Sequence, residues 1–430
     1  MTIADLHAAF LNCSGVSTDT RAILQGSMFF ALKGPSFDAN LFAEEALRKG
    51  ARYAVVDDPM VAKDDRFLLV SDVLSTMQEL AQRHRRGFSV PLIAITGTNG
   101  KTTTKELARA VLQKSLTVLA TAGNLNNHIG VPLTLLQLNK GHRIALIEMG
   151  ANKPGDIAEL CAIAEPTHGL ITNIGKAHLE GFGGYDGVLR TKTELYASVA
   201  KSNGLLFVND DDRVLMENSQ VAERFTYGTS TAADVQGRSR GSGPYLTVVF
   251  SGGNGNDLVA KTRLIGDYNL PNALAAVAIG KHFGVPDDRI AEALAEYQPG
   301  NNRSQFMDTG RNHLVLDAYN ANPTSMVAAL ENFARMPNDR PKLVILGDML
   351  ELGAGSLKEH GAIVELVGSL RFEAIFIGPQ FQQARSGPAS RCYPDAAELH
   401  AQFSKQPTTG HLILLKGSRG MKLETLVPVL

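Results

Sequence analysis

One stretch in the first third of the chain limits the possible folds more than any other. Pro91-Leu-Ile-Ala-Ile-Thr96 is apolar and β-branched, which is typical of a buried strand. Gly97-Thr-Asn-Gly-Lys-Thr-Thr-Thr104 follows directly, and Lys105-Glu-Leu-Ala-Arg-Ala-Val-Leu112 then has the spacing of a helix. The stretch therefore predicts a strand, a loop with two glycines and a helix in direct succession.

Such a loop is suited to bind the phosphates of a nucleoside triphosphate. Gly97 and Gly100 let backbone N–H groups approach an anion, and the start of the helix adds further N–H groups and a favourable dipole. Lys101 would reach the terminal phosphates, and the hydroxyl of Thr102 would ligate Mg²⁺. We expect the nucleotide to contact the whole loop: Gly97, Thr98, Asn99, Gly100, Lys101, Thr102 and Thr103.

The spacing of the glycines narrows the class of protein. Only two residues separate Gly97 from Gly100, whereas the common phosphate-binding pattern has four. The shorter spacing argues against a generic GTPase or kinase and leaves the phosphate argument intact. The alternative is an ordinary strand-to-helix turn with a solvated lysine. We favour phosphate binding because strand, glycines, Lys-Thr pair and helix occur in the required order.

Composition excludes several further classes. A chain of 430 residues is too long for one core, and a formal net charge of −1 lacks the basic excess that nucleic-acid binding needs. Cys13, Cys161 and Cys392 include no CxxC pair, so we expect neither disulfides nor a zinc site. Without a signal peptide or an apolar run of membrane-spanning length, the sequence indicates a cytoplasmic protein without membrane insertion. We also expect a monomer.

Strand-like and helix-like segments alternate, which predicts an α/β protein with three domains. Residues 1–87 form a small α/β domain, residues 88–299 a parallel sheet with the phosphate loop, and residues 300–430 a second, Rossmann-like parallel domain. We interpret Arg83-His-Arg-Arg-Gly87 as a polar helix end and linker with a solvated face. The expected strands are 27–32, 54–56, 67–70, 91–96, 117–121, 143–149, 169–174, 204–208, 313–317, 342–346, 374–377 and 411–415, with β-hairpins between about 225 and 265.

Parallel sheets bind their ligands beyond the carboxyl ends of the strands, so polar residues there are the first candidates. Glu148 ends a predicted strand and could hold Mg²⁺ directly or through water, although many strands end in a solvated Glu. His178 follows another strand and Lys192 lies within a predicted helix. Residue type alone favours a structural histidine and a surface lysine. Asp317 ends a strand of the third domain and could contact a ribose or an ordered water.

Three further polar residues are candidates for nucleotide binding. Asn269 and Asn272 are spaced i, i+3 and share a helix face, where their amides could pair with an adenine edge. Asn269 could instead be a simple helix cap. Arg303 lies in a predicted hinge, where it could reach a phosphate or remain solvated.

These motifs together resemble the Mur ligase family across all three predicted domains. Six separated motifs occur in the order of the family: Thr96-Gly-Thr-Asn-Gly-Lys-Thr-Thr103, Glu148-Met-Gly150, His178, Lys192-Thr-Glu-Leu-Tyr196, Gly266-Asp-Tyr-Asn-Leu-Pro-Asn272 and Asp317 through Pro323. Within the family, the chain looks most like the members that join D-alanyl-D-alanine to UDP-N-acetylmuramoyl-tripeptide. That finer resemblance rests on Ser17-Thr-Asp-Thr-Arg21, Phe29-Phe-Ala-Leu-Lys-Gly34, Asp38, Leu346-Gly-Asp-Met-Leu-Glu-Leu-Gly353, His360 and Lys416-Gly-Ser-Arg419.

The resemblance implies ATP-dependent amide formation through an acyl phosphate, in peptidoglycan precursor synthesis. It implies Lys101, Glu148, His178 and Lys192 as catalytic residues and two Mg²⁺ ions, one at Thr102 and Glu148 and one at His178 and Lys192. Lys192 would be a carbamate, since anionic oxygens attract a metal that an ammonium repels. The resemblance places adenine at Asn269 and Asn272, phosphates at Arg303, ribose at Asp317, the substrates at Ser17, Asp19, Arg21, Lys33, Asp38, Asn124, Asn126 and Asn127, and the dipeptide near Asp348, Lys416 and Arg419.

Two other functions compete with this one. Folylpolyglutamate synthase shares the ATP domain but lacks a uridine-nucleotide domain, and here nearly ninety residues precede the phosphate loop. A nucleotide-binding regulatory or scaffold protein that has lost catalysis is the other alternative, and the intact catalytic set argues against it.

Overall fold

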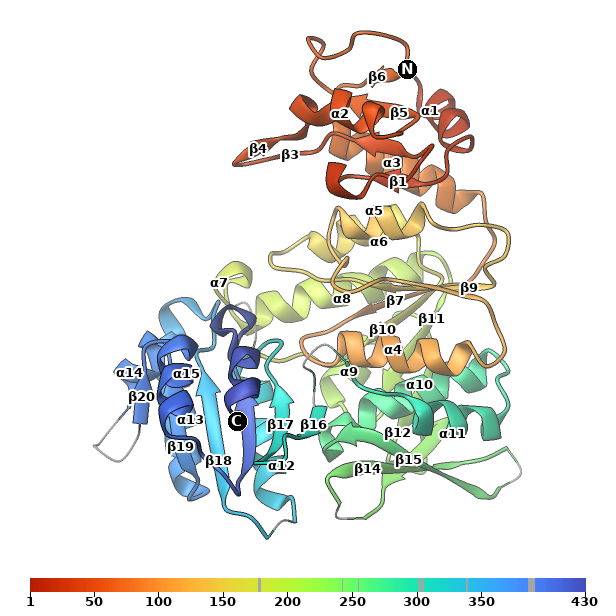
Figure 1. The fold of residues 1–430 in the computed structure, drawn as a ribbon. Coiled ribbons are helices and arrows are strands. Elements are labelled where there is room, and N and C mark those ends of the chain that lie inside the picture. The colour runs from red at the N-terminus through yellow and green to blue at the C-terminus, as the bar shows by residue number, and fades with distance from the viewer. Residues whose placement is uncertain are drawn as a thin grey trace.

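Three α/β units follow one another along the chain in the computed structural model, from the red N-terminal unit to the blue C-terminal unit (Figure 1). The structure describes residues 1–176, 179–241, 243–253, 255–300, 303, 305–337, 339–385 and 391–430. The α/β class and the three-domain organisation expected from the sequence are confirmed. Within those ranges, no helix combines the length and the apolar character needed to cross a bilayer.

The N-terminal unit is a four-stranded parallel sheet with a short antiparallel hairpin and three helices. Its elements are α1 (Ile3–Phe10), β1 (Val16–Ser17), β2 (Met28–Phe30), β3 (Lys33–Gly34), β4 (Phe37–Asp38), α2 (Ala43–Arg48), β5 (Tyr53–Val56), β6 (Phe67–Leu69) and α3 (Val73–Arg86). Side chains alternate along β2, so that Met28 and Phe30 pack with α1 and α3 while Phe29 packs with α2. Both faces of the sheet are therefore covered.

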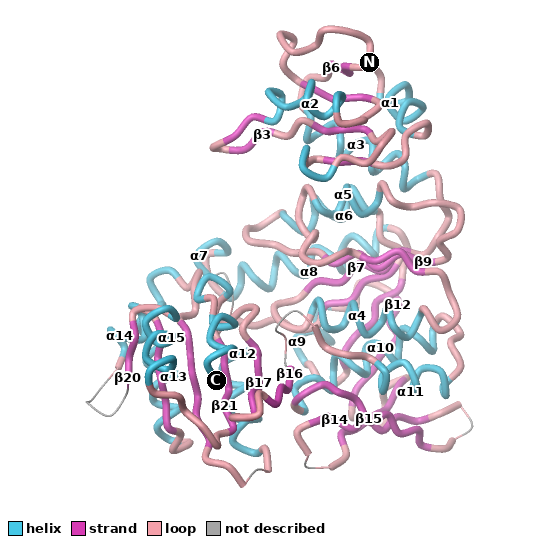
Figure 2. The backbone as a smooth tube through the Cα atoms, in the orientation of Figure 1, coloured by secondary structure: helices cyan, strands magenta, loops and turns pink. Residues whose placement is uncertain are grey.

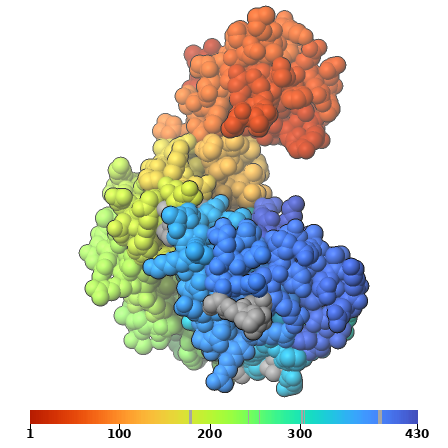
Figure 3. Space-filling view, turned by 90° about the vertical axis from the view of Figure 1, so that its left-hand side faces the viewer, coloured from red at the N-terminus to blue at the C-terminus, as the bar shows by residue number. Residues whose placement is uncertain are grey.

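Helix α3 joins this unit to the central one, and part of its last turn is buried. The guanidinium of Arg85 donates to the carbonyls of Phe88 (2.7 Å) and Ala164 (3.2 Å), the latter at the end of α6 (Asp156–Ala164). His84 is buried as well. The expectation of a solvated face at residues 83–87 is thus wrong for these two side chains, because the last carbonyls of α6 need donors from outside their helix. In Figure 3 the N-terminal unit stands on the central unit, apart from the blue C-terminal unit.

The central unit is built on a nine-stranded sheet in the order β15-β14-β13-β12-β11-β10-β7-β9-β8. Its strands are β7 (Leu92–Thr96), β8 (Val118–Ala120), β9 (Ile144–Glu148), β10 (His168–Ile171), β11 (Leu205–Asn209), β12 (Glu223–Gly228), β13 (Val235–Ser239), β14 (Tyr245–Ser251) and β15 (Asp257–Ile265). The strands from β8 to β13 are parallel, whereas β13, β14 and β15 pair antiparallel at one edge. The predicted parallel strands are confirmed. The predicted hairpins are confirmed for β13, β14 and β15, but the start of that range was predicted wrongly, because β12 and β13 pair in parallel.

Helices cover both faces of this sheet (Figure 2). Besides α6 they are α4 (Lys101–Leu112), α5 (Gly130–Leu135), α7 (Leu179–Phe182), α8 (Tyr185–Lys201), α9 (Arg213–Asn218), α10 (Leu270–His282) and α11 (Asp287–Glu296). Ile93 and Ile95 of β7 point into the core with α4, α10 and α11, and Leu92 and Ala94 into the core with α5, α6 and α8. Because β7 is buried on both faces, its sequence is apolar from Leu92 to Ile95, and only Thr96 at its end is polar.

The C-terminal unit is a six-stranded sheet in the order β16-β17-β21-β18-β19-β20, parallel except for β16. Its elements are β16 (Gln305–Asp308), β17 (His313–Asp317), α12 (Pro323–Arg335), β18 (Lys342–Gly347), α13 (Ser356–Ser369), β19 (Glu373–Ile377), α14 (Pro379–Ala384), β20 (Arg391–Tyr393), α15 (Ala396–Lys405) and β21 (Leu412–Lys416). The four predicted strands are confirmed. The two edge strands, β16 and β20, were not predicted because they are short and only half-buried.

Candidate active site

The loop between β7 and α4 adopts the backbone that its glycines predict. Gly97 has φ of +143° and Gly100 φ of +80°, where side chains are rarely found. A Cβ on Gly97 would lie 1.9 Å from Oγ1 of Thr172, and one on Gly100 would lie 2.5 Å from Oδ1 of Asn272. The loop is thus held between β10 and α10, with no room for a larger residue at either glycine.

Lys101 starts α4 and turns back over the loop. Its Nζ donates to the carbonyls of Gly97 (2.8 Å) and Thr98 (3.1 Å). Burial lowers the pKa of this ammonium, while the carboxylate of Glu148 acts to raise it. A phosphate at this position would replace two neutral acceptors with charged oxygens, which form stronger hydrogen bonds with an ammonium.

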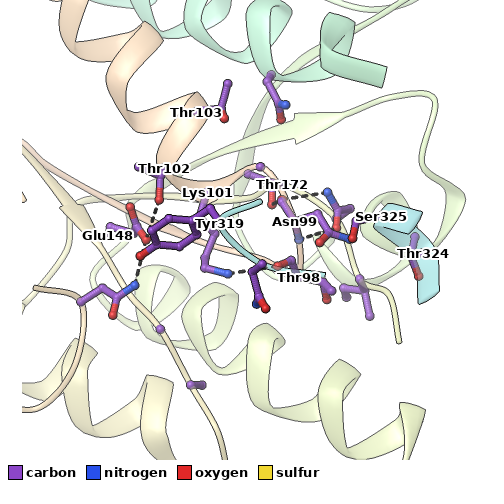
Figure 4. A pocket seen from close by; sticks show the side chains of 18 of the residues that line it. Thr98, Asn99, Lys101, Thr102, Thr103, Glu148, Thr172, Tyr319, Thr324 and Ser325 are labelled. Carbon is purple, nitrogen blue, oxygen red and sulfur yellow. Dashed lines mark hydrogen bonds between the residues drawn. The ribbon is translucent and has the colours of Figure 1, made fainter. Parts of the chain in front are cut away.

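Glu148 lies where the sequence placed it, at the end of β9 beside the loop (Figure 4). Its Oε1 accepts hydrogen bonds from Oγ1 of Thr102 (3.2 Å) and Nδ2 of Asn126 (2.8 Å). Its Oε2 is buried and has no hydrogen-bond partner among the residues that the structure describes. A buried carboxylate oxygen beside a hydroxyl fits Mg²⁺, which usually takes one or two protein oxygens and fills its shell with phosphate and water.

A second buried lysine next to Glu148 was not singled out from the sequence. The side chain of Lys105 is fully buried, and its Nζ donates to the carbonyl of Thr121 at 2.6 Å and lies 2.8 Å from Oε1 of Glu106. The same Nζ lies 4.0 Å from Oε2 of Glu148. Its position four residues after Lys101 puts both lysines on one face of α4, and that spacing is the signal that could have revealed it.

The two residues expected at a second metal differ in what the structure describes. His178 lies outside the described residues. Lys192 is buried in α8, and burial together with the charge of Lys101 holds its pKa well below the usual range. Its Nζ lies 6.0 Å from the ring centroid of Phe182, and among the described residues none accepts a hydrogen bond from it. The interpretation as a surface lysine, favoured by residue type, is therefore wrong.

The two asparagines of the predicted adenine site are buried next to the loop. Asn269 donates through Nδ2 to the carbonyl of Ile265 (2.8 Å) and accepts from Nδ2 of Asn272 (2.9 Å). Asn272 in turn accepts from Oγ1 of Thr104 (3.1 Å). Asn269 precedes α10, but its side chain does not cap the helix. The two amides fix each other and link α10 to α4.

The C-terminal unit brings further charged groups to the same place. Asp317 at the end of β17 is paired with the buried Nζ of Lys416 at 2.5 Å. The guanidinium of Arg303 lies 3.6 Å from the ring centroid of Tyr319, and that of Arg419 lies 5.5 Å from it. Tyr319 lies within the motif Asp317 through Pro323, but no pattern in the sequence identified it as a site residue.

A cavity of about 960 Å³ lies between the central and C-terminal units. It brings together most of the predicted nucleotide residues with the asparagines expected to hold substrate. The predicted residues on its wall are Thr98, Asn99, Gly100, Lys101, Thr102, Thr103, Asn124, Asn126, Asn127, Glu148, Asn269, Asn272, Arg303, Asp317 and Lys416. Its size suits a nucleotide together with part of a second ligand.

The predicted substrate residues of the N-terminal unit are not on that wall. Asp19 forms an ion pair with Arg21 (2.7 Å), whereas Lys33 lies 2.8 Å from Asp57 and only 3.8 Å from Asp38. The hydroxyl of Ser17 donates to the carbonyl of Asp19 (3.1 Å). A substrate held by these residues would have to extend from the N-terminal unit to the phosphate loop.

Asp348, a candidate for dipeptide binding, is used within the C-terminal unit. Its side chain is 1% exposed, and its two oxygens accept from the backbone N–H groups of Gln380 and Phe381, both at 2.9 Å. These amides start α14, so the carboxylate satisfies the first turn of that helix. We assign Asp348 a structural role rather than one in dipeptide binding.

Comparison with known proteins gives a family for this arrangement. Residues 95–280 match the Mur ligase middle domain, and residues 302–419 match the Mur ligase, glutamate ligase domain. A relative from Bacillus subtilis, named UDP-N-acetylmuramoyl-tripeptide–D-alanyl-D-alanine ligase, is 33% identical over 427 residues, covering 96% of this chain and 92% of its own. A relative of the same name from Escherichia coli is 34% identical over 440 residues, covering 99% and 95%.

Solved structures agree with the sequence relatives. MurF from Acinetobacter baumannii superposes with a TM-score of 0.88 at 30% identity, covering 99% of this chain and 98% of that one. MurF from Thermotoga maritima, solved in complex with ADP, gives a TM-score of 0.86 at 27% identity, covering 98% and 97%. A folylpolyglutamate synthase from Mycobacterium tuberculosis, at 15% identity and a TM-score of 0.61, shares the fold alone. The chain belongs to the Mur ligase family.

Proposed function

We propose that this protein is an ATP-dependent ligase that joins D-alanyl-D-alanine to UDP-N-acetylmuramoyl-tripeptide in peptidoglycan precursor synthesis. Near-full-length relatives carry that name, and the most direct structural support is the single cavity at the phosphate loop. Lys101, Thr102 and Glu148 reach it from the central unit, and Arg303 and Asp317 from the C-terminal side. A nucleotide in this cavity would contact both units. A ligase needs such a site because it activates one substrate and holds it close to the second substrate that attacks it.

The chemistry follows from the charges around the loop. The terminal carboxylate of the tripeptide attacks the γ-phosphate of ATP, ADP leaves, and an acyl phosphate forms. The amine of D-alanyl-D-alanine then attacks the acyl carbon, loses a proton, and releases inorganic phosphate with formation of the amide. Lys101 and the N–H groups at the start of α4 stabilise the charge on the transferred group. Mg²⁺, when bound, neutralises charge on the phosphate oxygens.

The residues proposed for the metals fall into two groups. Thr102 and Glu148 would hold one Mg²⁺, supported by the buried Oε2 of Glu148, which accepts no hydrogen bond from any described residue. His178 and Lys192 would serve a second, with Lys192 as a carbamate. Only a neutral amine adds CO₂, and the lowered pKa of Lys192 favours the neutral form. The 13C NMR spectrum of protein prepared in 13C-bicarbonate would detect that carbamate.

The remaining ligand assignments are proposed from the family. Asn269 and Asn272 would hold adenine, and Asp317 the ribose. The uridine nucleotide would lie at Ser17, Asp19, Arg21, Lys33 and Asp38, and the peptide near Asn124, Asn126 and Asn127. We further propose a cytoplasmic monomer that requires neither nucleic acid nor membrane.

Product mass is the direct test of this function. The protein is incubated with ATP, D-alanyl-D-alanine and a UDP-tripeptide that carries either diaminopimelate or lysine as its third residue. We expect one pairing to yield the UDP-pentapeptide, with ADP release that depends on both substrates and is abolished by Lys101→Ala. A noncatalytic nucleotide-binding protein would give no product with either tripeptide. Undiminished turnover by Lys101→Ala would refute the role of the loop.

A further inference from the structure

The short segment between β17 and α12, residues 318–322, touches the phosphate loop at one end and Arg303 at the other. We call these residues the docking loop. Ala318 and Ala321 are buried in the C-terminal unit, so the docking loop moves with that unit. Of its three polar side chains, Tyr319, Asn320 and Asn322, the first and the last make the contacts that carry the inference.

Asn322 forms a reciprocal amide pair with Asn99 of the phosphate loop, across 223 residues of sequence. Its Nδ2 donates to Oδ1 of Asn99 at 2.7 Å, and its Oδ1 lies 3.4 Å from Nδ2 of Asn99. The same Oδ1 caps α12 by accepting from the backbone N–H of Ser325 at 2.9 Å. Because the cap fixes which atom of the amide is oxygen, Nδ2 must face the phosphate loop.

Asn99 is itself held firmly within the phosphate loop. Its backbone N–H donates to Oδ1 of Asn173 at 3.0 Å, and its carbonyl accepts from Oγ1 of Thr172 at 2.6 Å. Both partners follow β10, the strand beside β7 in the sheet. The amide pair therefore connects the C-terminal unit to the part of the central unit that shapes the nucleotide site.

Tyr319, three residues before Asn322, supports Arg303 from the other side. The centre of the guanidinium lies 3.6 Å from the ring centroid, which is a face-on stack. Within the described ranges, the buried Nε of Arg303 has no hydrogen-bond partner, and no carboxylate there forms an ion pair with the guanidinium. The ring of Tyr319 therefore supports one face of this cation. Both residues line the nucleotide cavity, and Figure 4 shows Tyr319 in the same close view as Lys101, Thr102 and Glu148.

We propose that Asn322 and Tyr319 are positioning residues, with Asn322 seating the docking loop on the phosphate loop and Tyr319 thereby placing the guanidinium of Arg303 against the γ-phosphate. Arg303 is then the second cation at the γ-phosphate, after Lys101. It is in place only when the docking loop of the C-terminal unit contacts the phosphate loop. This inference rests on the proposed function, because it takes ATP as the nucleotide. It goes beyond that function by giving two residues that need not touch the nucleotide a defined effect on it.

Three substitutions test the inference. Tyr319→Leu removes the stacking face and Tyr319→Phe keeps it. Asn322→Ser removes the amide donor and keeps an oxygen that can cap α12. Each is also made together with Arg303→Ala. We expect Tyr319→Leu and Asn322→Ser to lower kcat at least tenfold, Tyr319→Phe to stay within about twofold of the natural sequence, and neither effect to exceed twofold once Arg303 is absent.

Nucleotide binding gives a readout that does not depend on turnover. Calorimetric titration compares MgADP with a nonhydrolysable Mg–ATP analogue, and we expect Tyr319→Leu to weaken only the analogue. Equal loss of affinity for both nucleotides, equal damage by Phe and Leu, or an undiminished effect in the Arg303→Ala background would each overturn the inference. If the natural protein makes no product, the proposed function fails, while the ratio of the two affinities still decides the role of Tyr319.

Discussion

Substitution of Gly100 by alanine tests whether the phosphate loop is as tightly held as its geometry indicates. The residue has φ of +80°, which costs an alanine about 1–2 kcal/mol. Its new Cβ would lie 2.5 Å from Oδ1 of Asn272, so that side chain must move. Asn272 would then lose its hydrogen bonds with Thr104 and Asn269, each costing about 1–2 kcal/mol when left unmade in a buried site.

Gly284 provides the matched control for this substitution. It has φ of +73°, and nothing lies within 4 Å of the position that a Cβ would take. Gly284→Ala therefore carries the backbone strain without the collision, and it lies off the nucleotide cavity. The difference between the two variants isolates the contact with Asn272, for which the lost hydrogen bonds give about 2–4 kcal/mol.

In Gly100→Ala the loop can escape the collision only by leaving the geometry that binds nucleotide, so we expect this difference to appear as lost nucleotide affinity. A cost of about 2–4 kcal/mol corresponds to a roughly 30- to 1000-fold weaker affinity for MgADP by calorimetric titration. Gly284→Ala should bind MgADP within about twofold of the natural sequence, with a similar loss of thermal stability from backbone strain. Affinities of the two variants within threefold of one another would refute the argument that Asn272 confines the loop.

Three further outcomes follow from the described contacts. Glu148→Gln removes the charge that would hold Mg²⁺, so the Mg²⁺-dependent gain in ATP affinity should disappear. Affinity for ATP in EDTA should stay within about twofold of the natural sequence, and equal losses with Mg²⁺ and with EDTA would contradict the metal role. Arg85→Met should cost about 2–4 kcal/mol of stability because buried carbonyls lose their donor, whereas Arg86→Met, at an exposed ion pair with Glu165, should cost less than about 1 kcal/mol by denaturant titration. Burial lowers the pKa of His168 from 6.5 to about 4, so the unfolded chain takes up a proton at a higher pH than the folded chain does. The free energy of unfolding should therefore decrease as the pH falls from 6.5 to 4, and thermal melts of His168→Phe should show a smaller decrease.

The sequence predicted best the site residues that belong to a continuous local pattern of strand, loop and helix. Strand, glycine loop and helix at residues 91–112 are continuous, and Glu148 ends its strand as the alternation of elements requires. Burial of Arg85 and Lys192 was not predictable, because it depends on which helices pack against them. The amide pair of Asn99 and Asn322 joins positions far apart in the chain, and no spacing rule relates the two.

Features at the edges of the sheets escaped prediction for a different reason. Strand β12 extends the central sheet by parallel pairing with β11, and β13 by parallel pairing with β12, yet the half-buried sequences of both strands alternate weakly. In the N-terminal unit, α1 has only eight residues, and its capping box at Thr2 and Asp5 is clear only once the helix is known. Short elements depend on their neighbours more than on their own composition.

The resting position of Lys101 has a consequence for how nucleotide enters. Its ammonium already points along the inside of its own loop, held by two peptide oxygens. An arriving triphosphate would therefore find the loop already in its binding conformation. Nζ of Lys101 would exchange two carbonyl acceptors for phosphate oxygens, and few residues would have to become ordered. Association of this kind should be fast and should show only a small change in heat capacity, in contrast to loops that fold around their ligand.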